Sequence, residues 1–138
     1  MRQVTELEKD ELVAYWVETA NKDYQTMKHL YDSGDYHWAL FVGHLIIEKL
    51  LKAHFVQVNN TQPPFSHNLL KLAEMANVEL DEGQEDLLDL ITSFNIRARY
   101  PDYKLDFYQK CTKKYAEEQI RNIEELRKWL IQKLQTSS

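Results

Sequence analysis

The chain has 138 residues, with three glycines, three prolines and one cysteine. Its length suits one domain with a buried core, and its composition excludes an intramolecular disulfide and leaves little material for tight β-turns. A net charge of −5 disfavours nonspecific binding to long duplex DNA. Residues 1–10 are charged and lack the apolar core of a signal peptide, and no apolar run could span a bilayer. We therefore expect a cytoplasmic protein with no membrane contact.

The spacing of apolar residues predicts five helices, over about 8–33, 36–58, 68–76, 82–95 and 113–135. The second is apolar on nearly every side between Trp38 and Ile47, so it should be the buried central helix. Asp35 is expected to cap it, Ser66 or His67 to open the third helix, and Thr112 to cap the last. No strand-like alternation is seen, and residues 136–138 are expected to fray. The pattern predicts one all-α domain over 1–138, an antiparallel up-and-down bundle of four to five helices with its core at about 8–135.

Residues 94–104 are expected to form a loop, because Pro101 disfavours helical geometry at Tyr100. Residues 97–114 have a net charge of +4, which leaves −9 for the rest of the chain. Residues 74–90 alone hold seven acidic side chains and no basic one. A basic segment on an acidic protein fits a small anionic ligand, such as a nucleotide or a short RNA, although charged loops are also often merely solvated.

Four polar side chains share one stripe of the apolar second helix, at spacings of seven, four and four: His37, His44, Glu48 and Lys52. A buried carboxylate needs a cation, so Glu48 is expected to pair with Arg97, Arg99 or Lys52. This pair could be structural alone. The spacing of His44 and Glu48 would also allow two metal ligands, but two ligands on one helix are weak evidence. We predict no metal site and no cofactor.

Three further residues have competing interpretations. Gly43 lies inside the second helix, which indicates either close approach of another helix, within the subunit or across a dimer, or simple tolerance. His67 is interpreted as a helix-start residue, and Cys111 as inert because it lacks a partner base. Three tyrosines near the basic segment could stack on bases or cover the bundle: Tyr103, Tyr108 and Tyr115.

Three short segments, in this order, resemble those of HEPN (higher eukaryotes and prokaryotes nucleotide-binding) domains: Glu48-Lys49-x-x-Lys52, His67-x-Leu69 and Arg99-Tyr100-Pro101-Asp102. The resemblance covers about residues 15–134. It implies a bundle of four or five helices that usually forms a homodimer with a cleft near the two-fold axis. Many members are encoded beside a minimal nucleotidyltransferase as a toxin–antitoxin pair, and others are nucleotide-binding modules of larger proteins.

The ribonuclease members of this family use an arginine followed four to six residues later by histidine. Neither Arg97 nor Arg99 is followed by such a histidine. The leading interpretation is therefore a non-catalytic accessory protein that binds a nucleotide or RNA phosphate, with Glu48 orienting an arginine. The alternatives are a metal-independent ribonuclease toxin with a rearranged site using His44 or His37, and a purely structural dimerisation module. The candidate ligand-binding residues are Arg97, Arg99, Tyr100, Asp102, Lys104, Glu48 and His44.

Overall fold

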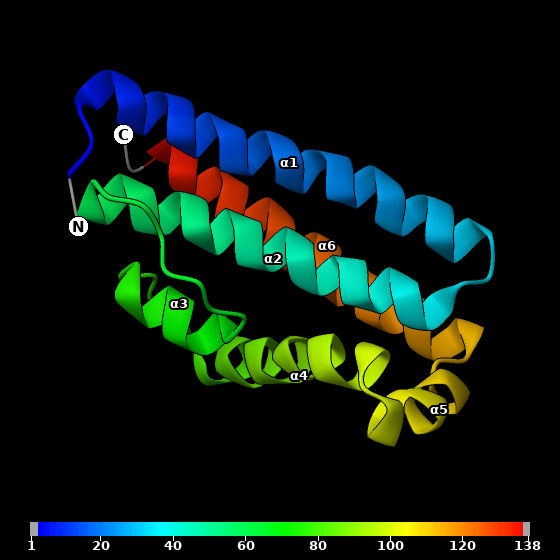
Figure 1. Ribbon diagram of the computed structural model, residues 1–138. Coiled ribbons are helices and arrows are strands. Elements are labelled where there is room, and N and C mark those ends of the chain that lie inside the picture. The colour runs from blue at the N-terminus through cyan, green and yellow to red at the C-terminus, as the bar shows by residue number, and fades with distance from the viewer. Residues whose placement is uncertain (1–2, 137–138) are drawn as a thin grey trace.

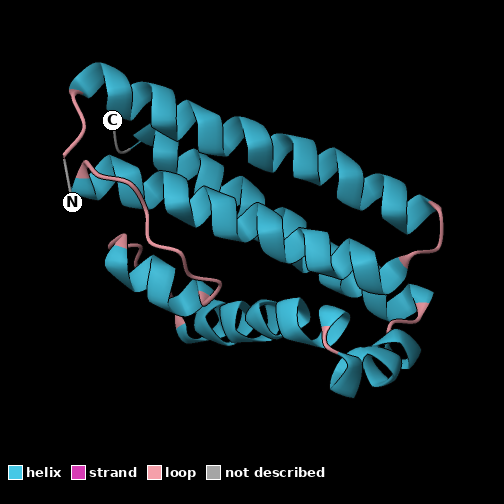
Figure 2. Ribbon diagram, in the orientation of Figure 1, coloured by secondary structure: helices cyan, strands magenta, loops and turns pink. Residues whose placement is uncertain are grey.

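The computed structural model describes residues 3–136, which form six helices joined by short connections (Figures 1 and 2). They are α1 (Glu6–Asp32), α2 (Tyr36–Asn59), α3 (Leu69–Met75), α4 (Glu82–Arg99), α5 (Pro101–Lys110) and α6 (Lys113–Thr136). Figure 1 shows α1 and α4 running in one direction and α2 and α6 in the other. The predicted all-α up-and-down bundle is confirmed. No helix in the described part of the chain is long and apolar enough to cross a membrane.

The helix ends follow local capping chemistry. Thr5 and Glu8 form a reciprocal capping box at the start of α1, and the Thr112 hydroxyl accepts a hydrogen bond from the Tyr115 N–H at 3.1 Å, as predicted for α6. The third helix is capped instead by Asn68, whose side chain accepts from the Lys71 N–H, so the expectation of Ser66 or His67 was wrong. The predicted fraying falls partly on residues 137–138, which lie outside the described residues.

Asp35 does not cap α2 through its side chain, contrary to expectation. Its backbone, at φ −89° and ψ 65°, departs from the extended geometry of the capping residues Thr5, Asn68 and Asp81. The preceding Gly34, at φ +81°, makes the turn out of α1. The connection between α1 and α2 is therefore set by backbone conformation.

The expected loop over residues 94–104 is almost entirely helical. Tyr100 is extended, at φ −86° and ψ 132°, as the following proline requires. However, α4 continues to Arg99 and α5 begins at Pro101, because proline is well suited to the first position of a helix. The junction between the two helices is therefore a single residue, Tyr100. Because α5 was not expected, the described part of the bundle has one more helix than predicted.

The buried helix α2 lies at the centre of the bundle and contacts each of the other five described helices. Gly43 is buried where α6 crosses it, and a Cβ placed there would lie 2.5 Å from Ile123 Cδ1. Of the interpretations of Gly43, the structure supports close approach of a helix within the subunit. At the far end of the bundle, Phe107 anchors α5 by packing on Phe94 of α4, with ring centroids 5.5 Å apart. Both phenylalanines are fully buried.

Candidate functional site

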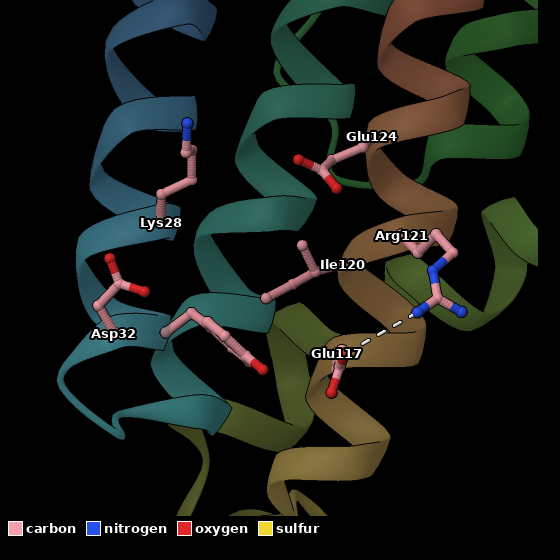
Figure 3. A pocket seen from close by; sticks show the side chains of 7 residues that line it. Lys28, Asp32, Glu117, Ile120, Arg121 and Glu124 are labelled. Carbon is pink, nitrogen blue, oxygen red and sulfur yellow. Dashed lines mark ion pairs between the residues drawn. The ribbon is translucent and has the colours of Figure 1, made fainter.

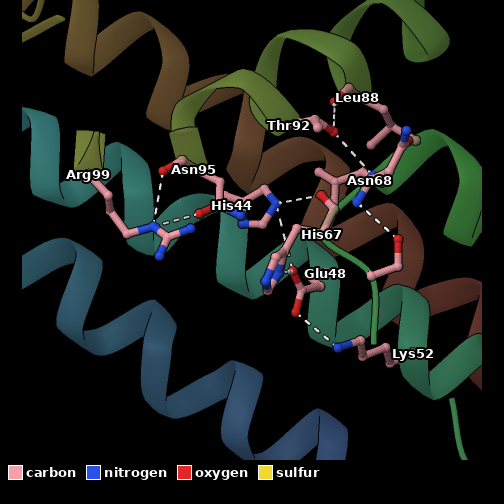
Figure 4. Close-up of polar contacts among 11 residues, drawn as sticks. His44, Glu48, Lys52, His67, Asn68, Leu88, Thr92, Asn95 and Arg99 are labelled. Atoms are coloured by element: carbon pink, nitrogen blue, oxygen red, sulfur yellow. Dashed lines mark hydrogen bonds and ion pairs between the residues drawn. The ribbon is translucent and has the colours of Figure 1, made fainter. Parts of the chain in front are cut away.

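A buried carboxylate lies at the middle of α2, with two hydrogen-bond partners (Figure 4). Glu48 Oε2 accepts a hydrogen bond from Lys52 Nζ at 3.0 Å, and Oε1 accepts one from His67 Nδ1 at 2.7 Å. The side chains of Glu48 and Lys52 are only 7% and 8% exposed, so each supplies the charge that the other needs in a buried position. The local cation, Lys52, is thus the partner. The expectation that Glu48 orients an arginine was wrong, since no arginine in the described part of the chain pairs with it.

His67 is the residue of this site that sequence reasoning missed. It precedes the Asn68 cap of α3, and its side chain is 63% exposed although its Nδ1 is bound to the buried Glu48. Its backbone carbonyl accepts a hydrogen bond from His44 Nε2 at 2.9 Å. The ring and the main chain of His67 are therefore both anchored to α2. Its Nε2, which has no hydrogen-bond partner in residues 3–136, remains available for an external group.

His44 supports this arrangement from inside the bundle. Its side chain is fully buried, and its Nδ1 has no hydrogen-bond partner among the described residues. Burial lowers the pKa of His44, with a further lowering from the charges of His67 and Arg99, against the hydrogen bond to His67 and the charge of Glu48. We therefore expect a neutral ring at pH 7, donating through Nε2. His44 positions His67 but cannot itself reach a ligand on the surface.

Arg99 lies at the last residue of α4, beside His44 in Figure 4. Its Nε donates hydrogen bonds to the side-chain and backbone oxygens of the buried Asn95, at 2.8 and 3.2 Å. The guanidinium carbon lies 5.6 Å from the ring centre of Phe41 and 5.5 Å from that of Tyr100. No carboxylate of residues 3–136 pairs with it, and its two terminal nitrogens have no hydrogen-bond partner there. Arg99 is thus oriented but not neutralised.

A family model described as HEPN domain matches residues 13–134, nearly the whole chain. This chain belongs to the HEPN family. The crystal structure of TT1696 from Thermus thermophilus is similar in fold, with a TM-score of 0.75 and 21% sequence identity, covering 88% of this chain and 97% of that one. At that identity the similarity concerns the fold alone. A comparison with curated proteins found no match.

The remaining predicted residues of this HEPN domain are spread over two faces. Lys104 of α5 lies over the Trp38 ring at 5.0 Å, on the Arg99 side, and Tyr100, whose ring packs near Arg99, is half exposed. Asp102 is exposed in the first turn of α5. Arg97 instead covers the Phe107 ring at 4.8 Å, because residues two apart on a helix point in different directions. The structure therefore does not bring Arg97 together with Arg99.

Arg97 faces Cys111, which follows the end of α5, and Tyr115 in the first turn of α6. Burial raises the pKa of the Cys111 thiol to about 11 and also raises the pKa of Tyr115. The charge of Arg97 partly offsets both shifts. A thiol with so high a pKa is a poor nucleophile. This agrees with the interpretation of Cys111 as inert.

A mixed-charge cavity of about 330 Å³ lies between α1 and α6 of the HEPN domain (Figure 3). Acidic side chains outnumber basic ones on its wall, and one base, Arg121, already pairs with Glu117 at 3.9 Å. The cavity is therefore poorly suited to a phosphate. No group of three or more His, Cys, Asp or Glu side chains within residues 3–136 is arranged to hold a metal ion.

Proposed function

We propose that this HEPN domain binds the phosphate group of a nucleotide or a short RNA, with Arg99 as the central contact. The observation that carries the proposal is an arginine held in place by a buried amide, Asn95, yet left without a carboxylate partner in the described chain. Arg97 and Arg127 also lack a carboxylate partner among the described residues, but Arg97 covers the buried Phe107 ring and Arg127 binds the exposed Asn21. Guanidinium groups bind phosphate oxygens through paired, charge-assisted hydrogen bonds.

The surroundings of Arg99 favour the same ligand. The aromatic rings of Phe41 and Tyr100 pack on the guanidinium, so it loses little freedom when it binds. The exposed Nε2 of His67, near His44, can donate to a phosphate oxygen when the ring is protonated and accept from a ribose hydroxyl when it is neutral. Lys104 adds a second positive charge on this side of the bundle.

We further propose that the protein acts in the cytoplasm as an accessory component beside a minimal nucleotidyltransferase, in a toxin–antitoxin type of system. This rests on the family alone. A homodimer is proposed on the same ground. Light scattering tests the dimer, and the neighbouring reading frame tests the partner.

The phosphate proposal is tested by titrating a fluorescently labelled short RNA at low salt and following its anisotropy. Arg99→Gln should weaken binding about 10- to 150-fold, since a hydrogen bond to a charged group contributes about 1.5–3 kcal/mol. Arg121→Gln is the matched control, because it removes an exposed arginine of α6 that lies by the mixed-charge cavity. Equal loss in both variants would show only nonspecific attraction. If Arg99→Gln mainly lowers the melting temperature and no ligand raises it, the structural-module alternative is correct.

Cleavage of RNA is a second candidate function, favoured by the Glu48–His67 pair. A carboxylate that binds Nδ1 of an exposed imidazole fixes the ring with Nε2 outward, which is how a general base is oriented. A neutral His67 would take the proton of a ribose 2′-hydroxyl as that oxygen attacks the adjacent phosphorus. The bond from phosphorus to the 5′-oxygen breaks, the proton passes to that oxygen, and a 2′,3′-cyclic phosphate remains. Arg99 would offset the added charge on phosphorus.

This arrangement replaces the earlier candidates His44 and His37, both of which are buried. The test is incubation of the protein with labelled RNA in the presence of EDTA. Cleavage that is lost in His67→Gln but kept in His29→Gln, which alters an exposed histidine of α1, supports a ribonuclease. If the RNA stays intact over a range of pH while its binding depends on Arg99, phosphate binding is supported and cleavage is not.

A further inference from the structure

A second hollow, of about 380 Å³, opens where α5 lies against the first turn of α2. Four of its five lining residues come from α5, the helix that sequence reasoning did not predict, and its wall is largely apolar and aromatic. The lining residues are His37, Pro101, Lys104, Leu105 and Tyr108. Tyr108 and Leu105 are 60% and 68% exposed, so the hollow is open to a ligand from solvent. Its volume lies within the range of small-molecule sites.

His37 is the buried polar side chain in this wall. The residue is 8% exposed, and its Nδ1 is buried with no hydrogen-bond partner in residues 3–136. The ring packs edge-on against Tyr108, with centroids 5.2 Å apart, and lies 5.0 Å from the Trp38 ring. Burial and the charge of Lys104 lower the pKa of His37, so the ring is neutral near pH 7 and has one N–H and one acceptor nitrogen.

A continuous row of side chains joins this hollow to Arg99. Lys104 Nζ lies 5.0 Å above the Trp38 ring, whose centroid is 5.8 Å from that of Phe41. Phe41 in turn lies beneath the Arg99 guanidinium. Residues 37 and 41 of α2 are one helical turn apart, a rise of about 6 Å. The hollow and the phosphate-binding arginine therefore occupy neighbouring turns of one face, a spacing suited to the base and the phosphate of a single nucleotide.

We propose that this hollow, named here the α5 pocket, binds the base of the nucleotide whose phosphate contacts Arg99. The inference rests on the proposed function and adds a base site to it. A planar heteroaromatic ring matches the pocket, because it can stack on Tyr108 and Leu105, pack against the neutral His37 ring, and direct the attached phosphate towards Lys104 and Arg99. An apolar peptide side chain would leave the charge of Lys104, which has no anionic partner among the described residues, without a counter-charge. A free phosphate would gain nothing from the aromatic wall.

The experiment compares three probes by calorimetric titration: AMP, adenosine and ribose 5-phosphate. Tyr108→Ala should weaken AMP binding about 5- to 150-fold, the range expected for the loss of one stacking partner, and leave ribose 5-phosphate unaffected. Tyr103→Ala is the matched control, because Tyr103 is similarly exposed on the same helix but does not line the pocket. Leu105→Glu, which places a carboxylate at the pocket mouth, should also weaken AMP binding while leaving the buried His37 in place.

The outcomes separate the two proposals. If Tyr108→Ala and Tyr103→Ala weaken AMP equally, the base site is wrong, and a large effect of Arg99→Gln still upholds the phosphate site. If Arg99→Gln changes neither AMP nor ribose 5-phosphate binding, the proposed function fails. Absence of binding by AMP, GMP, CMP and UMP at millimolar concentration overturns the α5 pocket as a nucleotide base site. Circular dichroism of each variant verifies that the bundle is folded.

Discussion

Adding one methyl group at Gly43 tests the packing at the centre of the bundle. The Cβ of Gly43→Ala would lie 2.5 Å from Ile123 Cδ1 and 3.4 Å from Met27 Sδ. Overpacking of a filled core costs about 1–3 kcal/mol, whereas replacing glycine by alanine inside a helix returns about 1 kcal/mol. We therefore expect the free energy of unfolding to fall by about 1 kcal/mol. Urea unfolding followed by circular dichroism measures this change.

A second substitution identifies the cause. Ile123→Val removes the clashing methyl and alone should cost about 0.5–1.5 kcal/mol. In the double variant the new alanine methyl occupies the space left by Cδ1, so the two changes should compensate with a coupling energy of about 1–3 kcal/mol. Gly83→Ala is the control, since a Cβ there meets only Asp81 Oδ1, at 3.4 Å. Additivity within about 0.5 kcal/mol, or equal effects at Gly43 and Gly83, would refute the reasoning.

Three further predictions concern buried polar groups. Glu48→Gln leaves Lys52 buried without a counter-charge and should lower the free energy of unfolding by about 3–5 kcal/mol. Adding Lys52→Met should restore part of this loss. If urea unfolding shows no recovery, the two side chains do not stabilise each other as a buried ion pair. Burial lowers the pKa of His54, whose ring binds the Leu130 carbonyl, below the unfolded value near 6.5. The stability that this residue contributes is therefore full above about pH 6.5 and is lost as the pH falls towards the folded pKa. His54→Gln should flatten the dependence of the urea midpoint on pH between neutral and mildly acidic conditions. Cys111, with a pKa of about 11, should react slowly with iodoacetamide until urea unfolds the chain, and rapid labelling of the folded protein would disprove its burial.

The helices were predictable because their signals are local. Apolar spacing located α1, α2 and α6 to within a few residues, and the hydroxyl cap at Thr112 followed from its position before a periodic segment. The junction at Tyr100 was not predictable, since a proline ends one helix and can begin the next with the same local preference. The general character of the bundle therefore followed from the pattern, but not the presence of α5.

The candidate site was predictable only in part, for a different reason. The Glu48–Lys52 pair follows from helical spacing of four residues. The Glu48–His67 contact spans nineteen positions and depends on the path of the coil between α2 and α3, which no periodicity encodes. The one available signal was that a buried carboxylate has two oxygens to satisfy and Lys52 serves one of them. Likewise, Asn95 could be recognised as the support of Arg99 only once α4 was known to continue past it.

Only one residue, the extended Tyr100, connects α4 to α5. Arg99 immediately precedes Tyr100 and Pro101 immediately follows it, so the direction of α5 is fixed by two backbone angles and by the seat of Phe107 on Phe94. Inserting one residue here would lengthen the connection by up to about 3.8 Å and displace Phe107 from Phe94. Many proteins tolerate loops of different lengths between two helices. Here a longer junction would separate Arg99 on α4 from the side chains of the α5 pocket.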